Sequence, residues 1–485
     1  MGRVERVRRV LGPSSSVGQE SGEGLVQMSL FDGDTACGAS FDLAELFEAY
    51  YRCRAKKRNT LNAIAFEVDL ETNLVQLWHE LNTRSYSPGR SVAFVIDKPV
   101  KREIFAADFR DRVVHHLIIN KLTPCFEAEF IHDSYASRPG RGTLFGVRRL
   151  QRFIRACSSN YSCDAYVLRL DISAFFMNIN VEILFTKLKS FIEAKYHELD
   201  RDLLIDLCRV VVLNDVTKGA AIKGDRSDWD GLPAAKSLFG TPAGCGLPIG
   251  NLTSQVFANF YLNELDHFIK HQLGVRYYGR YVDDLVLVDR DRSRLAALIP
   301  VLTSYLRAEL GLQLHPRKTE LQHYSKGVRF LGAVIKPGRV YVGKRTKGNF
   351  HNSIITHNAA AVGRVPSRAE QQAFLASMNS YLGLLRHYDT RRLRYSILAK
   401  YVKGWWSYAE ITAGAEKFVL RSGVREPLRR ARRLVRLSCE WDPQRAWVDG
   451  GGFGCVLARL VVRAGSLDLE VLLSHLLARD IGRLH

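Results

Sequence analysis

The stretch RYVDDLVLV at residues 280–288 sets two adjacent acids, Asp283 and Asp284, between apolar runs. The run VRYYGRY that ends at residue 281 and the run LVLV after the acids are rich in Tyr, Val and Leu, which are typical of strands. We therefore predict a β-hairpin with both acids at its bend. Asp is common in turns because its side chain bonds the nearby backbone. Two crowded carboxylates, however, repel each other unless a cation joins them, and Mg²⁺ prefers oxygen ligands.

A third acid, Asp171, follows the apolar run AYVLRL at residues 165–170. This run predicts a buried central strand. A lone acid at a strand end is commonly a cap, but the pair Asp283 and Asp284 gives Asp171 a second interpretation. Three carboxylates on neighbouring strands can hold two Mg²⁺ ions, which activate an attacking hydroxyl and stabilise the leaving oxygen in phosphoryl transfer.

The composition of the chain points to a polyanionic partner. The 485 residues are enough for two or three domains, and the net charge of +20 suits either nucleic acid or an anionic membrane surface. The apolar content of 46% and the charged content of 25% are ordinary for a globular protein. No apolar run approaches the roughly 18 residues of a membrane-spanning helix, so we expect no membrane partner.

The cysteines and the N-terminus indicate the compartment. Nine cysteines at irregular spacing, with no Cys-x-x-Cys pair, argue against a zinc ribbon or a disulfide framework and for a reducing environment. The N-terminal residues are basic but lack the apolar core of a signal peptide. We therefore expect a flexible basic tail at residues 1–41 and a cytoplasmic protein.

The order of the predicted elements indicates an α+β fold. Residues 42–86 have helical periodicity, residues 91–98 alternate like a strand, and residues 165–335 alternate between strands and helices. Residues 214–245 are polar and contain Gly and Pro, so we expect an irregular insertion or hairpin there. Past residue 345 the chain is expected to be almost wholly helical.

Seven motifs in order carry a family resemblance. The chain resembles a bacterial reverse transcriptase, and the tetrapeptide YVDD at 281–284 is one of the matching motifs. The other six are KPVKREIFAADFRDRVVHHLI (98–118), SYASRPGRGT (134–143), LDISAFFMNI (170–179), GLPIGNLTSQ (246–255), HPRKT (315–319) and RFLG (329–332).

The resemblance implies a right-hand polymerase architecture. The expected parts are a flexible N-terminal tail (1–41), fingers and palm (42–345), a helical thumb (346–412) and a basic helical C-terminal extension (413–485).

The resemblance also implies roles for the acids. Asp171 and Asp283 would bind two Mg²⁺ ions directly, with the Ile172 carbonyl as a further oxygen ligand, and Mn²⁺ is a possible substitute. Asp284 would complete the set toward the ion that activates the primer 3′-hydroxyl.

The nucleotide site is expected around five further residues. Lys98 and Arg102 would meet the incoming triphosphate, where charge-assisted bonds are strongest. Phe176 matches the position of a sugar gate that would collide with a ribose 2′-hydroxyl, although plain core packing is the alternative. The neighbouring Phe175 is expected to point into the core because side chains alternate along a strand. Ile249 and Gly250 belong to the fourth motif, in which many relatives carry Gln where this chain has Ile249. Since Ile can only pack, we expect looser nucleotide selection and lower fidelity.

Template, primer or RNA contacts are expected at basic and polar positions of the other motifs and of the C-terminal third. Tyr381 lies in the expected thumb, where helix packing is the alternative, and four arginines share the outward face of an amphipathic helix. The full set is Arg138, Arg141, Ser254, Gln255, Lys318, Gly332, Tyr381, Arg429, Arg430, Arg432 and Arg433.

Several functions remain open at this point. The form IGNLTSQ resembles both the reverse transcriptases of antiviral defence systems and those of diversity-generating retroelements, and the C-terminal extension favours defence. The expected partners are an RNA template (a non-coding RNA), dNTPs and the DNA product, with a second copy or an accessory protein also possible. The alternatives are an RNA-binding scaffold with a dispensable polymerase site, and a template-independent or protein-primed DNA polymerase.

Overall fold

The computed structural model describes residues 40–55, 60–97 and 100–421. At its centre lies a four-stranded antiparallel sheet in the order β5-β6-β3-β7. The strands are β3 (Tyr166–Asp171), β5 (Tyr277–Tyr281), β6 (Asp284–Asp289) and β7 (Glu320–His323). Strand β3 pairs on both sides, so the predicted central strand is confirmed, and so is the hairpin of β5 and β6.

Both faces of this sheet are buried. Leu168 and Leu170 of β3 lie with Leu285 of β6 in a large apolar core, while Val167 and Val286 belong to a second core on the opposite face. Helix α6 (Thr143–Cys157) supplies side chains to the second core. The large core draws on α5 (Phe109–Glu129), α8 (Val181–Lys195), α9 (Arg201–Val212), α10 (Leu252–Tyr261), α11 (Asn263–His267) and α12 (Arg292–Leu310).

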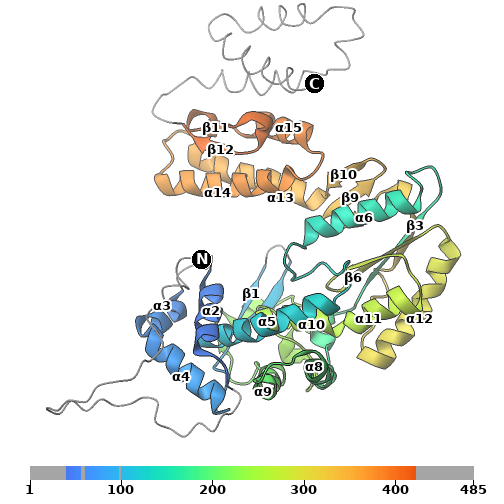
Figure 1. The fold of residues 1–485 in the computed structure, drawn as a ribbon. Helices are drawn as coiled ribbons and strands as arrows, with labels where there is room; N and C mark the ends of the chain where they lie inside the picture. Colours follow the sequence, from blue (N-terminus) through green and yellow to red (C-terminus); the bar gives the residue numbers. More distant parts are fainter. Residues whose placement is uncertain (1–39, 56–59, 98–99, 422–485) are drawn as a thin grey trace, which may run out of the picture. The chain divides into compact units, whose positions relative to one another are not determined.

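The N-terminal described segment is helical, as predicted for residues 42–86. It forms α2 (Leu43–Arg54), α3 (Leu61–Val68) and α4 (Leu70–Asn82), which are labelled in Figure 1. Apolar side chains of these helices join the large core. The predicted tail at 1–41 lies almost wholly outside the described residues. Within the described part of the chain, every helix is too short or too polar to span a bilayer.

A second, smaller sheet has the order β2-β1-β4. Strand β1 (Val92–Ile96) runs antiparallel to β2 (Arg102–Ala106) and parallel to β4 (Ala221–Ile222). Strand β4 and three 3₁₀ turns make up the irregular insertion that the sequence predicted at 214–245.

A buried carboxylate fastens this insertion to β2. Glu103 accepts hydrogen bonds from Trp229 Nε1 at 2.6 Å, from Ser237 Oγ at 2.8 Å and from the backbone N–H of Leu238 at 2.5 Å. Leu238 then joins Ala93 and other side chains in a small apolar cluster beneath the insertion.

The C-terminal described region is mostly helical but not wholly so. A three-stranded sheet of β8 (Val328–Phe330), β9 (Ala333–Lys336) and β10 (Arg339–Val342) leads into its helices. The helices are α13 (Lys344–Asn358), α14 (Arg368–Leu385) and α15 (Arg391–Tyr401).

Two short strands correct the expectation of helix past residue 345. They are β11 (Ala409–Ile411) and β12 (Phe418–Leu420), which pair with each other. Ala415 and Phe418 share the apolar core of α13–α15, so that core continues past the expected thumb limit at 412. Strands of three residues are too short to show a period in sequence. The rest of the expected extension at 413–485 lies outside the described residues.

Candidate active site

The strand register brings two of the three acids together. Asp171, the last residue of β3, lies directly opposite Asp284, the first residue of β6. Tyr281 pairs with Asp284 across the hairpin, so Val282 and Asp283 form its two-residue turn. The three acids therefore meet at one end of the central sheet, as the sequence analysis expected.

The turn that carries the acids has an unusual backbone. Val282 has φ = 54°, although a β-branched residue rarely adopts a positive φ. A positive φ at the first turn position alone is the pattern of a type II′ hairpin turn, which usually has Gly there. Such a conformation persists only where the surroundings impose it.

Hydrogen bonds hold both carbonyl groups of the turn. The Val282 carbonyl oxygen accepts from Arg280 Nη1 at 3.1 Å, and the Asp283 carbonyl oxygen accepts from the Ile172 N–H at 3.2 Å. Among the described residues, none donates to the carbonyl oxygen of Ile172. That oxygen is therefore available as the metal ligand predicted from the sequence.

The electrostatics of the site show excess negative charge. Burial first, and then the neighbouring Asp284 and Asp171, raise the pKa of Asp283 to about 6. Burial also raises the pKa of Asp284, which the cations of Arg169 and Lys318 partly offset. Half-buried carboxylates whose pKa values are raised in this way favour the approach of a cation.

Lys318 supplies such a cation. Its Nζ lies 2.9 Å from each carboxylate oxygen of Asp171. The backbone brings it there, because the N–H of His315 donates to the Asp171 carbonyl at 2.7 Å and the N–H of Lys318 donates to the His315 carbonyl at 3.1 Å. Lys318 was predicted as a template or primer contact, and in this structure its ammonium bonds an acid of the site.

The donors fit a divalent cation by their chemistry. Opposed carboxylates and a peptide carbonyl are the hard oxygen ligands that Mg²⁺ takes. Among the residues that the structure describes, however, no three acids, histidines or cysteines are arranged to hold a metal ion. Since Lys318 bonds both oxygens of Asp171, this ammonium would compete with a metal ion for that carboxylate.

Phe175 and Phe176 follow the first acid on a helical turn, α7 (Phe175–Asn178), not on a strand. Ala174, with φ = 43°, starts this turn. Phe175 is 2% exposed, so its predicted burial is confirmed, although the reason given for it, strand alternation, is wrong. Phe176 is half-buried and packs against both the large core and the small cluster under the insertion.

Ile249 and Gly250 lie against the second sheet. Ile249 packs on the small apolar cluster that contains Leu238, and its carbonyl oxygen accepts from the Phe105 N–H at 2.9 Å. Gly250 has φ = 131°, and a Cβ there would lie 2.9 Å from the Phe105 carbonyl oxygen. Only Gly allows this close approach, which fixes where Ile249 lies.

The structure describes one of the two predicted triphosphate contacts. Arg102 is exposed at the start of β2, and among the described residues none forms an ion pair or hydrogen bond with its guanidinium. Lys98 lies outside the described residues.

Arg138 is a correction to the expected RNA contacts. Its Nε and Nη2 donate to the Glu127 carboxylate at 2.9 and 2.8 Å. Its Nη1 donates to the carbonyl oxygens of Ile131 and Ser134 at 2.7 and 3.0 Å. This guanidinium is buried and occupied, so it fastens the 131–138 segment to α5 and is not presented to an external RNA.

Three of the remaining expected template, primer or RNA contacts differ in their exposure, and a fourth, Tyr381, packs against another ring. Arg141 is half-exposed, with Nη1 3.0 Å from His132 Nε2, while Ser254 is buried on α10 and its neighbour Gln255 is exposed. Tyr381 packs its ring 5.3 Å from that of Phe350, which favours the helix-packing alternative.

Gly332 and four arginines complete the expected template, primer or RNA contacts. Gly332 has φ = 80°, and its carbonyl oxygen accepts from the Gly343 N–H at 2.7 Å. The four arginines Arg429, Arg430, Arg432 and Arg433 lie outside the described residues.

Sequence reasoning missed Arg280. It is wholly buried on β5, and its guanidinium bonds the acid-bearing turn. The available signal was an arginine inside the strand YYGRY, since a charge in an otherwise apolar strand needs a buried partner.

Comparison with known proteins assigns the part of the chain that contains the three acids to a protein family. Residues 98–335 match the family model of "Reverse transcriptase (RNA-dependent DNA polymerase)". Protein YkfC of Escherichia coli (strain K12) is 22% identical over an alignment of 306 residues that covers 56% of this chain and 73% of that protein. The nuclear intron maturase 1, mitochondrial, of Arabidopsis thaliana is 22% identical over an alignment of 338 residues that covers 54% of this chain and 45% of that protein.

Solved structures give more distant similarities. Apo telomerase from Candida tropicalis superposes with a TM-score of 0.41 at 12% identity, covering 75% of this chain and 74% of that one. Telomerase from Candida albicans in complex with a fragment of telomeric RNA gives a TM-score of 0.39 at 12% identity, covering 65% and 57%.

Proposed function

Since this chain is a reverse transcriptase, an RNA-directed DNA polymerase whose family match spans residues 98–335, we propose that Asp171, Asp283 and Asp284 are its catalytic acids. The observation that carries this assignment is the register of β3 and β6, which sets Asp171 opposite Asp284 beside the turn residue Asp283. On this proposal the enzyme makes cDNA from an associated RNA by two-metal nucleotidyl transfer.

The acids and one carbonyl would hold the metal ions. Asp171, Asp283 and the Ile172 carbonyl oxygen would be the direct ligands, and Asp284 would complete the set toward the ion that activates the primer 3′-hydroxyl. Two Mg²⁺ ions bound there, or Mn²⁺ in their place, would supply the Lewis acidity that activates the primer 3′-hydroxyl and stabilises the leaving pyrophosphate. The raised pKa of Asp283 comes first from burial and then from the neighbouring Asp284 and Asp171, and it supports this assignment because a bound cation would favour the charged carboxylate. Lys318 neutralises part of this charge until a metal arrives.

Neighbouring side chains would select the nucleotide. Arg102, exposed on β2, and Lys98 hold the triphosphate, and Phe176 excludes a ribose 2′-hydroxyl. Ile249 and Gly250 of the fourth motif would contact the same nucleotide. Ile249 packs against the same small apolar cluster as Phe176, and this packing supports the proposed role of Ile249.

Positive charge would hold the template and primer. The proposed RNA or template–primer contacts are Arg141, Gln255, Lys318, Gly332 and the four arginines Arg429, Arg430, Arg432 and Arg433. Ser254 and Tyr381 would act indirectly, since their packing holds the neighbouring residues in position. On this proposal residues 42–345 are fingers and palm and the helices from 346 are the thumb, followed by the basic extension.

The biological role is proposed as antiviral (anti-phage) defence in the bacterial cytoplasm, with a non-coding RNA as template. Ile249 supports a second candidate, a low-fidelity enzyme of a diversity-generating retroelement, because an apolar residue there cannot hydrogen-bond the nucleotide. The two roles differ in product: a short repetitive DNA favours defence, while errors clustered at template adenines favour diversification.

The test uses the full chain purified with whatever RNA it carries. Mg²⁺ and the four dNTPs are added, and both the bound RNA and any new DNA are sequenced, beside a variant with Asp283→Ala and Asp284→Ala. DNA complementary to one bound RNA, absent in the variant, is the expected result. A protein that retains one specific RNA but makes no DNA would overturn the proposal in favour of an RNA-binding scaffold. DNA that matches no bound RNA would favour a template-independent or protein-primed polymerase.

A further inference from the structure

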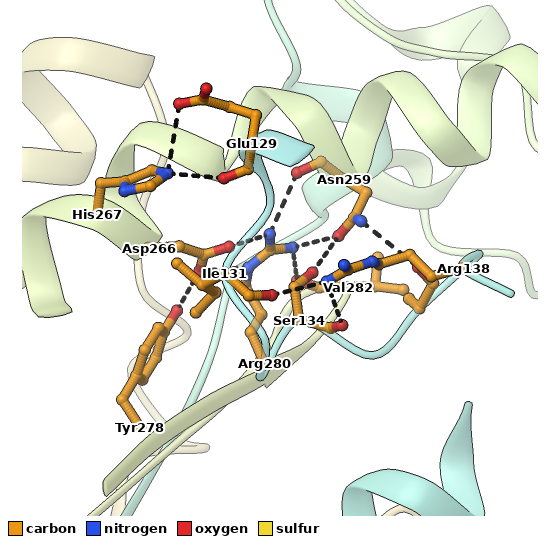
Figure 2. A network of polar contacts seen from close by, with 11 residues as sticks. Glu129, Ile131, Ser134, Arg138, Asn259, Asp266, His267, Tyr278, Arg280 and Val282 are labelled. Atoms are coloured by element: carbon orange, nitrogen blue, oxygen red, sulfur yellow. Dashed lines mark hydrogen bonds and ion pairs between the residues drawn. The ribbon is translucent and has the colours of Figure 1, made fainter. Parts of the chain in front are cut away.

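A fully buried ion pair lies behind the hairpin that carries two of the acids. The Arg280 guanidinium of β5 bonds the Asp266 carboxylate of α11, with Nε to Oδ1 at 2.8 Å and Nη2 to Oδ2 at 2.5 Å. Both side chains have no exposed surface. Figure 2 shows the guanidinium between Asp266 and Asn259, with the Tyr278 hydroxyl pointing at Asp266 from the same strand.

Every N–H of this guanidinium has an acceptor. Besides the two bonds to Asp266, Nη1 donates to Asn259 Oδ1 at 2.9 Å and to the Val282 carbonyl at 3.1 Å, and Nη2 donates to the Asn259 carbonyl at 3.1 Å. An arginine has five N–H donors in a fixed planar fork, and a lysine has three around one atom. Lysine therefore cannot reproduce this set.

The backbone of Arg280 is fixed as firmly as its side chain. Its N–H donates to the Asp133 carbonyl at 2.9 Å, and its carbonyl oxygen accepts from the Tyr135 N–H at 2.9 Å. The Ser134 hydroxyl lies between these residues and bonds Asn259 Oδ1 at 3.0 Å. The same arginine thus joins α10, α11 and the 133–135 segment to the acid-bearing turn.

Stability alone does not explain so costly an arrangement. Removing two charges from water is expensive, and a well-packed apolar set of similar volume is often as stable as a buried ion pair. What an apolar set cannot do is donate a hydrogen bond to the Val282 carbonyl. That carbonyl belongs to the residue with φ = 54°, whose conformation decides where Asp283 and Asp284 point.

We propose that Arg280, held by Asp266, is a positioning residue that sets the Val282–Asp283 turn for metal binding. This inference rests on the proposed function, since it assigns Arg280 a role toward the ions that the acids would bind. Residues that orient metal ligands through such bonds change metal affinity by roughly 10- to 100-fold when they are lost.

The test variant replaces the buried set with apolar groups: Arg280→Met, Asp266→Leu and Tyr278→Phe together. The matched control is the same replacement in another buried set, Lys121→Met, Asp200→Leu and Tyr196→Phe. In that set the Lys121 ammonium lies 2.6 Å from Asp200 and the Tyr196 hydroxyl donates to Asp200 at 2.8 Å. None of its bonds reaches the hairpin or β3.

The first readout is Mn²⁺ binding by electron paramagnetic resonance, without substrate, and the second is primer extension. The Arg280 variant is expected to bind Mn²⁺ roughly 10- to 100-fold more weakly and to lose kcat, with its KM for template–primer within about twofold of the wild-type value. The control is expected to keep both the Mn²⁺ affinity and kcat. Wild-type Mn²⁺ affinity and kcat in a folded Arg280 variant, or equal losses in the control, would overturn the proposal.

Two further variants keep the outcomes distinct. If the triple variant does not fold, Arg280→Lys retains the charge opposite Asp266 and must show the same weakened Mn²⁺ binding, and unchanged binding there counts against the proposal. Asp171→Asn with Asp283→Asn tests the metal site itself. If that pair retains Mn²⁺ binding, the proposed metal ligands are wrong, whatever Arg280 does.

Discussion

Asp171 and Asp284 lie directly opposite each other on antiparallel strands, and the ammonium group of Lys318 bonds both oxygens of Asp171. In this structure the lysine provides the positive charge that the three crowded acids need. On our proposal Lys318 and a metal ion then compete for the same carboxylate.

This competition gives a first prediction. Lys318→Met should increase the thermal stabilisation that saturating Mg²⁺ gives relative to EDTA. The lysine is 57% exposed, so losing its ion pair should cost only about 0.2–1 kcal/mol in EDTA, while the metal no longer has to displace an ammonium. Lys189→Met, which removes an exposed lysine paired with Glu193 on α8, is the control. An equal Mg²⁺ effect in both variants would speak against competition at Asp171.

A second prediction concerns the sugar of the nucleotide. Phe176→Ala should raise incorporation of ribonucleotides relative to deoxynucleotides by roughly 10- to 100-fold, because it removes the ring proposed to collide with a 2′-hydroxyl. Single-nucleotide extension with rNTPs and dNTPs measures the ratio. Phe175→Leu serves as the control, since Phe175 is buried in the core and its loss should lower stability without changing the ratio. An unchanged ratio in Phe176→Ala would mean that Phe176 serves in packing.

A third prediction concerns fidelity. Ile249→Gln should lower misincorporation, because a Gln can hydrogen-bond the nucleotide where an Ile only packs. The change should also cost about 1–3 kcal/mol of folding free energy, since it sets a polar group against the apolar cluster around Leu238. Sequencing of cDNA made on a defined RNA measures the error rate, and Ile249→Val is the apolar control. Equal error spectra in all three proteins would remove Ile249 from the fidelity argument.

A fourth prediction concerns the insertion at 214–245. Glu103→Ala should release it from β2, because one buried and two half-buried donors lose their acceptor, at no more than about 1–3 kcal/mol each. Hydrogen exchange should quicken over residues 226–240, and KM for dNTPs should rise, since Leu238 supports the cluster behind Ile249. Glu48→Ala, which removes an exposed carboxylate of α2, should do neither. Unchanged exchange in Glu103→Ala would show that other contacts hold the insertion.

The sequence predicted the hairpin, the central strand and the meeting of their acids because these follow from local patterns. Alternation, β-branched residues and two adjacent acids are visible along the chain. The α+β class follows from the order of the elements in the same way.

The sequence did not reveal which polar residues turn inward. Arg138 and Arg141 look alike in sequence, yet Arg138 is buried on Glu127 and Arg141 is half-exposed. Arg280 likewise depends on Asp266, a partner from another element. The need for Gly279 is also tertiary, because a Cβ there would collide with the buried Tyr135 ring. Side chains that come from different elements have no shared signature in one sequence.

The central claim is that Asp171, Asp283 and Asp284 bind the metal ions of nucleotidyl transfer. The most direct measurement is anomalous diffraction from crystals grown with Mn²⁺, an RNA template, a DNA primer and a non-hydrolysable dNTP. The account predicts Mn²⁺ peaks coordinated by Asp171 and Asp283, with Lys318 displaced from Asp171. A bound nucleotide without Mn²⁺ at these acids, or with Lys318 still on Asp171, would contradict it.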